Sequence, residues 1–299
     1  MKTCLIIGID GFTGKYVGEI FEREGYNVVG TVLTIGDGDA APRRIHKMDL
    51  LDYDNIRDVV GKANPDIVVH LAGISFVVSK TFSSFYEVHI MGTRNLLSAL
   101  VDGEAPVSKV ILASSGQIYG AARNATEGTR PSPMNDYSVS KLAMEYMAMT
   151  WMDKLPIIIT RPFNYIGIGQ APHFAIPKIL SAFIRKDPVL PLGRTDVRRD
   201  FSDVRFVARC YLALAEKGAP GEIYNIASGR AVSLEHIIGE LAGISGFHPE
   251  IARDERFVRG NEPDTITGNC NKLMSLDNAP EHIPMEETLA WMYRNENRD

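Results

Sequence analysis

The chain has 299 residues, of which 45% are hydrophobic and 23% charged, and its formal net charge is −5. This length suits one large α/β domain or two coupled ones, with a core that needs no disulfide or metal to hold it together. Lysine and arginine are scattered along the chain and do not form clusters. The sequence therefore predicts neither a nucleic-acid partner nor a membrane partner.

The three cysteines, Cys4, Cys210 and Cys270, are far apart and form no CxxC motif or Cys/His cluster. This pattern favours reduced thiols over a disulfide framework, and it predicts no metal site. The first apolar run is too short for a signal peptide, and no apolar stretch has the length of a membrane span. We therefore expect a cytoplasmic protein.

Apolar runs rich in Val and Ile alternate with helix-like segments through the first half of the chain. The expected strands cover residues 4–7, 27–33, 66–71, 109–114 and 157–161, and the expected helices cover residues 14–24, 83–101 and 137–151. Strands that are buried on both faces need such continuous apolar runs, and their alternation with helices indicates a parallel sheet between helical layers. The expected fold class is α/β, with a Rossmann-type doubly wound parallel sheet.

The composition changes after Pro162, where proline and glycine become frequent. Two helices, at residues 177–185 and 234–242, and a strand that returns to the sheet, at residues 222–227, are expected here. We expect an interrupted main domain and a smaller α/β C-terminal lobe. The expected division is residues 1–163 plus about 205–229 for the main domain, and residues 164–204 plus 230–299 for the lobe.

A glycine-rich turn joins the first expected strand to the first expected helix. Its residues are Gly8, Asp10, Gly11, Phe12, Thr13 and Gly14, with the glycines spaced GxxGxxG. Such a turn lets backbone N–H groups approach the pyrophosphate of a dinucleotide at a helix N-terminus. The spacing by itself also fits any strand–turn–helix corner that needs glycines, so it indicates a cofactor only together with other motifs.

The end of the second expected strand bears on the choice of dinucleotide. A carboxylate about twenty residues after the glycines binds the adenosine 2′-OH of NAD, whereas an arginine there accepts the 2′-phosphate of NADP. This strand runs into Thr34, and Asp37 and Asp39 follow only in a glycine-rich loop, before Arg43 and Arg44. The missing acid favours NADP(H) over NAD(H), with simple solvation as the alternative for the two arginines.

Tyr137 and Lys141 lie four residues apart and hence on one face of an expected helix. A phenol with a pKa of about 10 is a poor acid–base group near neutral pH unless a fixed cation stabilises its phenolate, and Lys141 supplies that cation. Ser115, at the end of a strand, adds a hydroxyl for the reacting oxygen. A YxxxK spacing is common on exposed helix faces, but here it follows both the glycine turn and Ser115. These three residues form the predicted catalytic group.

Several motifs stand in the order found in the extended short-chain dehydrogenase/reductase family, of the NAD-dependent epimerase/dehydratase type. They are the glycine turn, Asp49-Leu50, His70-Leu71-Ala72-Gly73, residues 114–120, Tyr137 with Lys141, and Arg161-Pro162-Phe163-Asn164. The chain resembles this family over nearly its whole length. The resemblance implies contacts to the adenine from Asp49 and Leu50, to the cofactor cleft from Leu71, Ala72 and Gly73, and to the nicotinamide from Pro162 and Phe163.

Within the family, the chain most resembles the reductases of GDP-4-dehydro-6-deoxy-D-mannose. The matching segments are residues 161–170, 199–204, 258–262, 268–269 and 272–273. The resemblance implies that Asn164, Arg199 and Arg259 hold the diphosphate and nucleoside of a nucleotide-sugar, a role that suits the bidentate arginine fork. It also implies substrate contacts from Ser75, Gln117, Asn261 and Glu262. An ion pair with Asp200 or Asp203 is the alternative role for Arg199.

Two residues depart from the family pattern. The family usually has Asn three residues before Gly92-Thr93, where this chain has His89, and it usually has Pro where this chain has Gly260. We expect His89 to take over the structural hydrogen bonds of the Asn, with tuning of the site as the alternative. Gly260 is expected to loosen the loop beside Arg259.

The predicted catalytic group serves reduction, epimerisation and dehydration alike. Dehydration needs a further acid–base group, and the positions where resembling dehydratases carry it hold Gly116 and Gln117, which do not titrate. We therefore expect NAD(P)H-dependent reduction of a nucleotide-linked 4-keto-6-deoxy sugar, with a GDP-linked substrate and Tyr137 as proton donor. The alternatives are a nucleotide-sugar 4-epimerase that retains NAD and a non-catalytic NADP(H)-binding regulator.

The helix that carries Tyr137 is rich in methionine. The methionines are Met144, Met147, Met149 and Met152. They fit core packing or a subunit interface better than a ligand site. The family resemblance implies that this helix packs against a partner subunit, and we expect a homodimer.

Overall fold

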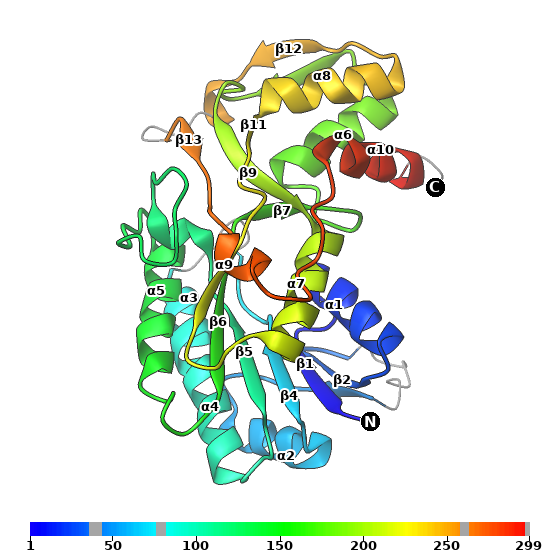
Figure 1. Ribbon diagram of the computed structural model, residues 1–299. Coiled ribbons are helices and arrows are strands. Elements are labelled where there is room, and N and C mark those ends of the chain that lie inside the picture. The colour runs from blue at the N-terminus through cyan, green and yellow to red at the C-terminus, as the bar shows by residue number, and fades with distance from the viewer. Residues whose placement is uncertain (36–43, 76–81, 258–262, 297–299) are drawn as a thin grey trace.

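The computed structural model describes residues 1–35, 44–75, 82–257 and 263–296 (Figure 1). Its centre is a sheet of seven strands in the order β3-β2-β1-β4-β5-β6-β10, in which every neighbouring pair is parallel. The strands are β1 (Thr3–Ile7), β2 (Asn27–Val32), β3 (Ile45–Lys47), β4 (Ile67–His70), β5 (Lys109–Ala113), β6 (Ile157–Pro162) and β10 (Ile223–Ile226). This is the Rossmann strand order with one strand added beyond β6, and it confirms the expected fold class.

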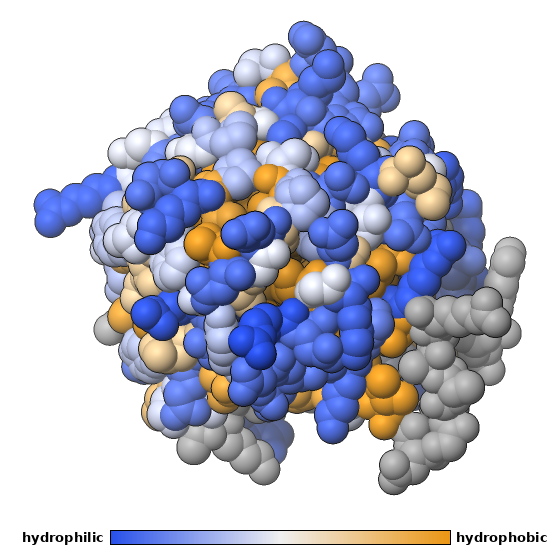
Figure 2. Space-filling view, turned by 90° about the horizontal axis from the view of Figure 1, so that it is seen from below, coloured by the Kyte–Doolittle hydropathy of each residue, from blue (hydrophilic) through white to orange (hydrophobic). Residues whose placement is uncertain are grey.

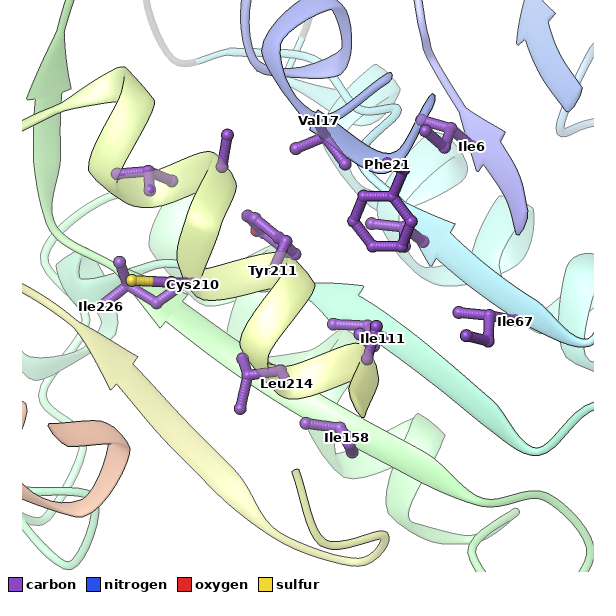
Figure 3. Close-up of a cluster of buried hydrophobic side chains, with 14 of the residues drawn as sticks. Ile6, Val17, Phe21, Ile67, Ile111, Ile158, Cys210, Tyr211, Leu214 and Ile226 are labelled. Carbon is purple, nitrogen blue, oxygen red and sulfur yellow. The ribbon is translucent and has the colours of Figure 1, made fainter. Parts of the chain in front are cut away.

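Helices cover both faces of this sheet. On one face lie α1 (Phe12–Arg23) and α7 (Val204–Lys217), and on the other lie α2 (Tyr53–Ala63), α4 (Thr93–Asp102) and α5 (Asp136–Met149). Figure 3 shows the first face, where Phe21 of α1 and Tyr211 and Leu214 of α7 pack over Ile111 and Ile158 of the sheet. Successive strand residues point to opposite faces, so two apolar layers require the continuous apolar runs seen in the sequence.

Above the carboxyl edge of this sheet, a four-stranded sheet and a two-stranded sheet pack with helices around a separate apolar cluster. Their strands are β7 (Asn164–Ile166), β8 (Val189–Leu192), β9 (Arg198–Asp203), β11 (Ala231–Ser233), β12 (Glu250–Arg253) and β13 (Thr265–Ile266). The helices here are α6 (Ala175–Arg185), α8 (Leu234–Ser245) and α10 (Met285–Glu296), while the short α9 (Asn271–Met274) contacts β10 and adds Leu273 to the core of the main sheet. Leu180, Leu241 and Met292 belong to the shared core of α6, α8 and α10. The residue limits of the two domains stay a prediction.

The expected helix at residues 83–101 is three successive helical segments. These are α3 (Ser83–Tyr86), a π-helical segment η1 (Glu87–Gly92) and α4. Gly92 is the last residue of the π segment. A Cβ at Gly92 would lie 2.8 Å from the Cβ of Leu50, so the close approach of η1 to Leu50 requires glycine. Each π turn inserts a residue into a helix, and such turns are frequent at functional sites.

Four helices of the described residues had no counterpart in the sequence prediction. They are α2, α7, α9 and α10. Two further short segments, η2 (Gly116–Tyr119) and η3 (Glu255–Phe257), are 3₁₀ turns. The other predicted elements begin and end within three residues of their observed limits.

The methionine-rich part of α5 lies against the core of the chain itself. Met144 is 1% exposed, and Met147, Met149 and Met152 are partly buried against the cluster formed by the sheet, α2 and α4. Of the two interpretations of these methionines, core packing is the one observed.

Hydrophilic side chains cover most of the molecular face shown in Figure 2, with apolar side chains exposed between them in several places. Within the described residues, none of the helices combines the length and the apolar character needed to cross a bilayer.

Candidate active site

The predicted site residues meet at the carboxyl edge of the sheet. Gly8 follows β1, Leu71 follows β4, Ser115 follows β5, and Phe163 follows β6. The chain leaves β1 toward β2 on one side and leaves β4 toward β5 on the other, so the strand order reverses between these two neighbours. Ligands of doubly wound folds bind in the crevice outside the sheet at this reversal.

The glycine turn is packed so closely that two of its glycines are obligatory. Gly8 has a φ of +82°, and a Cβ there would lie 3.0 Å from the Cα of Ala72. A Cβ on Gly14 would lie 2.1 Å from the carbonyl oxygen of Gly8. Gly11 is the N-cap of α1, and no side chain in the described part of the protein caps this end. The turn thus presents the open amide end of a helix to the crevice, which fits a diphosphate.

The glycine turn also contacts the C-terminal lobe through Tyr165. The hydroxyl oxygens of Thr13 and Tyr165 are 2.7 Å apart, and the rings of Phe12 and Tyr165 are stacked with centroids 5.9 Å apart. Asp10, between the glycines, is exposed. Sequence reasoning missed Tyr165, whose only signal was its place directly after Asn164.

The predicted adenine contacts lie just after β3. Leu50 is buried against Gly92, and Asp49 is exposed with its Oδ1 accepting the N–H of Leu51 at 2.9 Å. Arg44 lies farther from the crevice than the sequence suggested. The carbonyl of Arg44 accepts the N–H of Gly30, and the β2–β3 register pairs Val32 with Lys47. Arg44 is therefore about 10 Å back along the sheet from its carboxyl edge.

Tyr137 lies in the first turn of α5, which begins with a capping box between Asn135 and Ser138. Ser115 caps η2, and its Oγ accepts the N–H of Gln117 at 3.1 Å, so the proton of this hydroxyl is available to Tyr137. The hydrogen bond from Ser115 lowers the pKa of Tyr137, but burial outweighs it and raises that pKa to about 12. The phenol therefore holds its proton at neutral pH.

Lys141 stands one turn further along α5, with its side chain buried under the loop that follows β4. Its Nζ donates to the carbonyl of Ala113 at 2.8 Å, and a Cβ on Gly73 would lie 3.5 Å from it. Burial lowers the pKa of Lys141 to about 8, and the nearby charge of Glu145 opposes this shift. Lys141 is therefore charged at neutral pH, but its pKa lies only slightly above that pH.

A buried ion pair anchors α5 to β6 beneath the catalytic group. Glu145 and Arg161 are 0% and 4% exposed, and their closest oxygen and nitrogen are 2.6 Å apart. Arg161 also donates to the hydroxyl of Tyr119 at 2.7 Å, which in turn donates to Asn225 at 2.8 Å. Each buried polar group of this network thus has a partner. Its signal in the sequence was a glutamate four residues after Lys141, on the same helix face.

The space beside Gly116 is filled by an aromatic ring. A Cβ on Gly116 would lie 2.7 Å from Cδ2 of Phe163, and a Cβ on Gly268 would lie 2.4 Å from Cε2 of the same ring. Phe163 also stacks on Tyr119 with centroids 6.0 Å apart. An acidic side chain at position 116 would therefore displace Phe163. The side chain of Gln117 is exposed.

Two of the predicted substrate residues lie on neighbouring strands of the lobe. Asn164 begins β7 and donates to the carbonyl of Asp200 at 3.3 Å, and Arg199 lies on β9. The carboxylate of Asp200 accepts backbone N–H groups of Ser228, Gly229 and Gly268. The carboxylate of Asp203 is 2.6 Å from Arg205. Both acids that were alternatives as partners of Arg199 thus bind other groups.

The remaining predicted residues fall into two sets. Ser75 is exposed in the loop after β4. Arg259, Asn261 and Glu262, together with Gly260, Asp37, Asp39 and Arg43, lie outside the described residues. The structure thus brings Ser115, Tyr137 and Lys141 together beside the glycine turn. The assignment of individual residues to cofactor or substrate stays a prediction.

The strand order, the open helix end at the glycine turn and the serine–tyrosine–lysine group define a dinucleotide-dependent enzyme of the short-chain dehydrogenase class. The model of the NAD-dependent epimerase/dehydratase family matches residues 4–227. The chain belongs to this family and is an NAD(P)-dependent enzyme.

Two characterised relatives match most of the chain. GDP-6-deoxy-D-talose 4-dehydrogenase of Aggregatibacter actinomycetemcomitans is 32% identical over 295 residues, which are 97% of each chain. GDP-6-deoxy-D-mannose reductase of Pseudomonas aeruginosa is 32% identical over 257 residues, which are 82% of this chain and 84% of the relative. Among solved structures, RMD from Pseudomonas aeruginosa in complex with NADPH is 28% identical, with a TM-score of 0.87, and the match covers 100% and 99% of the two chains.

Proposed function

We propose that this protein reduces a GDP-linked 4-keto-6-deoxy sugar with NADPH. The observation that carries the proposal is the Ser115–Tyr137–Lys141 group at the crevice, in which Ser115 and Lys141 are buried and Tyr137 is half-buried, next to a position 116 that Phe163 closes to any acid. Dehydration needs a further acid–base group, whereas reduction needs only a proton donor beside the hydride. The names of the two relatives, one a dehydrogenase and one a reductase of GDP-linked 6-deoxy sugars, support this choice.

The bound dinucleotide supplies the hydride. Tyr137 donates its proton to the keto oxygen, and Ser115 donates a hydrogen bond to the same region of developing negative charge. Lys141 stabilises the phenolate that remains after proton transfer, since its ammonium is held between the carbonyl of Ala113 and the Gly73 loop. Donors that are fixed in this way contribute about 2.7–4 kcal/mol each to the transition state.

The nucleotide-sugar is proposed to lie between the crevice and the lobe. Asn164 begins β7, and Arg199 lies on the neighbouring strand β9, so both can face a diphosphate that extends from the crevice. Arg259 is the third proposed contact, with Ser75, Gln117, Asn261 and Glu262 around the sugar. Arginine forks bind phosphate oxygens in pairs, which suits this role.

The choice of NADPH rests on the end of β2 and on one relative. Val32 ends β2, and Leu33 and Thr34 after it carry no charge, so no carboxylate there repels a 2′-phosphate. Lys47 pairs with Val32 in the neighbouring strand and is an exposed cation at that edge. The RMD structure holds NADPH.

The test is NADPH and NADH consumption with GDP-, dTDP-, UDP- and CDP-linked 4-keto-6-deoxy sugars. We expect the GDP-linked sugar with NADPH to give the highest kcat/KM, and NMR of the product to show a new hydroxyl at C4. Purified protein that retains NAD and interconverts 4-epimers without net consumption would contradict the proposal and indicate an epimerase. Binding of NADPH without turnover of any of these sugars would indicate a regulator.

We further propose a homodimer through the outer face of α5. Val139 and Tyr146 are seven residues apart on this helix and 39% and 56% exposed, and Met91 of η1 is exposed beside it. Exposed apolar side chains that share a helix face favour burial against a partner. Sedimentation equilibrium is expected to give twice the chain mass for the wild type and the chain mass for Tyr146→Glu. A monomeric wild type would exclude this interface.

A further inference from the structure

His89 is a buried residue beside the catalytic group for which the proposed reaction has no use. It lies in the π segment η1 and is 2% exposed. Its ring lies edge-on to Tyr137 with centroids 5.7 Å apart, and it is stacked with Phe85 at 5.9 Å. A Cβ on Gly73 would lie 3.1 Å from its Nε2. His89 thus touches the π segment, α5 and the loop after β4 at once.

Both ring nitrogens of His89 have hydrogen-bond partners. Nε2 is 3.1 Å from the backbone nitrogen of Ile74, and Nδ1 is 2.9 Å from Oγ of Ser140. Oγ of Ser140 is also 2.8 Å from the carbonyl oxygen of Tyr137. One chain of hydrogen bonds therefore joins the loop after β4, which carries Ser75, to the backbone of the catalytic tyrosine.

The direction of every bond in this chain follows from its two ends. The backbone N–H of Ile74 can only donate, so Nε2 accepts and carries no proton. The carbonyl of Tyr137 can only accept, so the hydroxyl of Ser140 donates its proton to that carbonyl. Nδ1 must then carry the ring proton and donate it to Ser140. Only a neutral imidazole with its proton on Nδ1 satisfies all three bonds.

The charges around His89 agree with this state. Burial, and after it the basic groups Lys141 and His70 that face the ring, lower the pKa of His89 to about 2. The ring therefore stays neutral between pH 5 and pH 9, a range that lies entirely above that pKa. A fixed neutral ring in this state cannot exchange protons with the substrate during turnover.

We infer that His89 is a positioning residue that sets the distance between the Tyr137 phenol and the Gly73–Ser75 loop, through one donated and one accepted hydrogen bond. The inference rests on the proposed function in that it takes Tyr137 as the proton donor. The hydrogen bond that His89 accepts from Ile74 holds the loop that borders the cofactor and carries Ser75. The hydrogen bond that it donates to Ser140 holds the first turn of α5 and hence the phenol. Loss of either hydrogen bond misplaces a different reactant.

Two conservative substitutions separate these two sides. The amide nitrogen of Asn stands near the place of Nδ1, so His89→Asn keeps the bond to Ser140 and loses the bond to Ile74. The amide oxygen of Gln stands near the place of Nε2, so His89→Gln keeps the bond to Ile74 and loses the bond to Ser140. Loss of one buried hydrogen bond corresponds to a factor of about ten in a rate or equilibrium constant. We expect His89→Asn to raise the substrate KM about tenfold with kcat maintained, and His89→Gln to lower kcat about tenfold with KM maintained.

The controls distinguish positioning from bulk and from acid–base chemistry. Ser140→Ala is expected to reproduce the loss of kcat in His89→Gln, and the double variant should lose no more than either single one. His89→Phe keeps the ring volume and should show both defects, while His236→Phe, at an exposed histidine, should show neither. Equal kinetic behaviour of the Asn and Gln variants, or wild-type kinetics of His89→Phe, would overturn the inference.

A measurement that needs no substrate keeps this test separate from the proposed function. In ¹⁵N-histidine NMR of the whole protein, the His89 signals, assigned by their loss in His89→Phe, should show a neutral ring with its proton on Nδ1 from pH 5 to pH 9. Ser140→Ala should shift the Nδ1 signal. A ring that titrates in this range, or a proton on Nε2, would refute the inference. Failure of every keto sugar to react would refute the proposed function alone.

Discussion

Replacing Tyr137 by Phe is expected to lower kcat by a factor of about 10²–10⁴ while the KM for NADPH stays near its wild-type value. The substitution removes only the phenolic oxygen, which is the proposed proton donor. The phenol is protonated at neutral pH because burial raises its pKa to about 12, so it donates the proton only when negative charge develops on the substrate oxygen. Steady-state kinetics with NADPH and the GDP-linked keto sugar measure the effect.

The matched control is Tyr146→Phe, which removes the same oxygen from an exposed tyrosine of the same helix. This variant should keep wild-type kcat. Full activity in Tyr137→Phe would exclude the proposed mechanism, because phenylalanine has no hydroxyl proton to donate to the substrate.

Replacing Lys141 by Met is expected to lower kcat by a factor of about 10²–10³ without loss of stability at neutral pH. The methionine fills the same buried space but removes the cation that stabilises the phenolate. Burial lowers the pKa of Lys141 to about 8 in the folded protein, against 10.5 in a model compound. Below pH 8 the charged lysine therefore costs folding free energy, and this cost disappears as the pH rises from about 8 to 10.5. An uncharged residue should leave the melting temperature at pH 7 equal or higher.

The same pKa predicts the pH profile of the wild type. Its kcat/KM for reduction should fall as the pH rises through about 8, because Lys141 loses its charge there. The basic groups that face Lys141 are His70 and His89, and the acid is Glu145. The residual activity of Lys141→Met should lack this decline, and Lys154→Met, at an exposed lysine after α5, should keep it. A decline of equal shape in Lys141→Met would assign the titration to another group.

Much of the fold could be predicted because its determinants are local in the sequence. Strands such as β1 and β4 are buried on both faces, so they are continuous apolar runs that need no partner to be seen. The helices that were missed are less distinct: α2 is short and polar on one side, and α7 follows a strand without a break. The π segment η1 could not be predicted, because the inserted residue is stabilised by the packing of Gly92 on Leu50, which lies far away in the chain.

The candidate site divides in the same way. Gly8, Ser115, Tyr137 and Lys141 have recognisable spacings, because a turn, a strand end and a helix face each impose a fixed separation on the residues that share them. Arg44 was a weaker prediction. The register of β3 against β2 sets its distance from the crevice, and register depends on pairing rather than on sequence position.

The sequence by itself determined the parallel α/β fold, the dinucleotide turn and the Ser115–Tyr137–Lys141 group, since each is a local pattern of apolar runs, glycines or helical spacing. Only the tertiary structure decided that Phe163 closes position 116 and that Glu145 pairs with Arg161. It also decided that His89 links Ile74 to the backbone of Tyr137 through Ser140. These contacts join side chains from elements that are distant in the chain, and the packing of those elements alone sets which atoms come within hydrogen-bond or van der Waals distance.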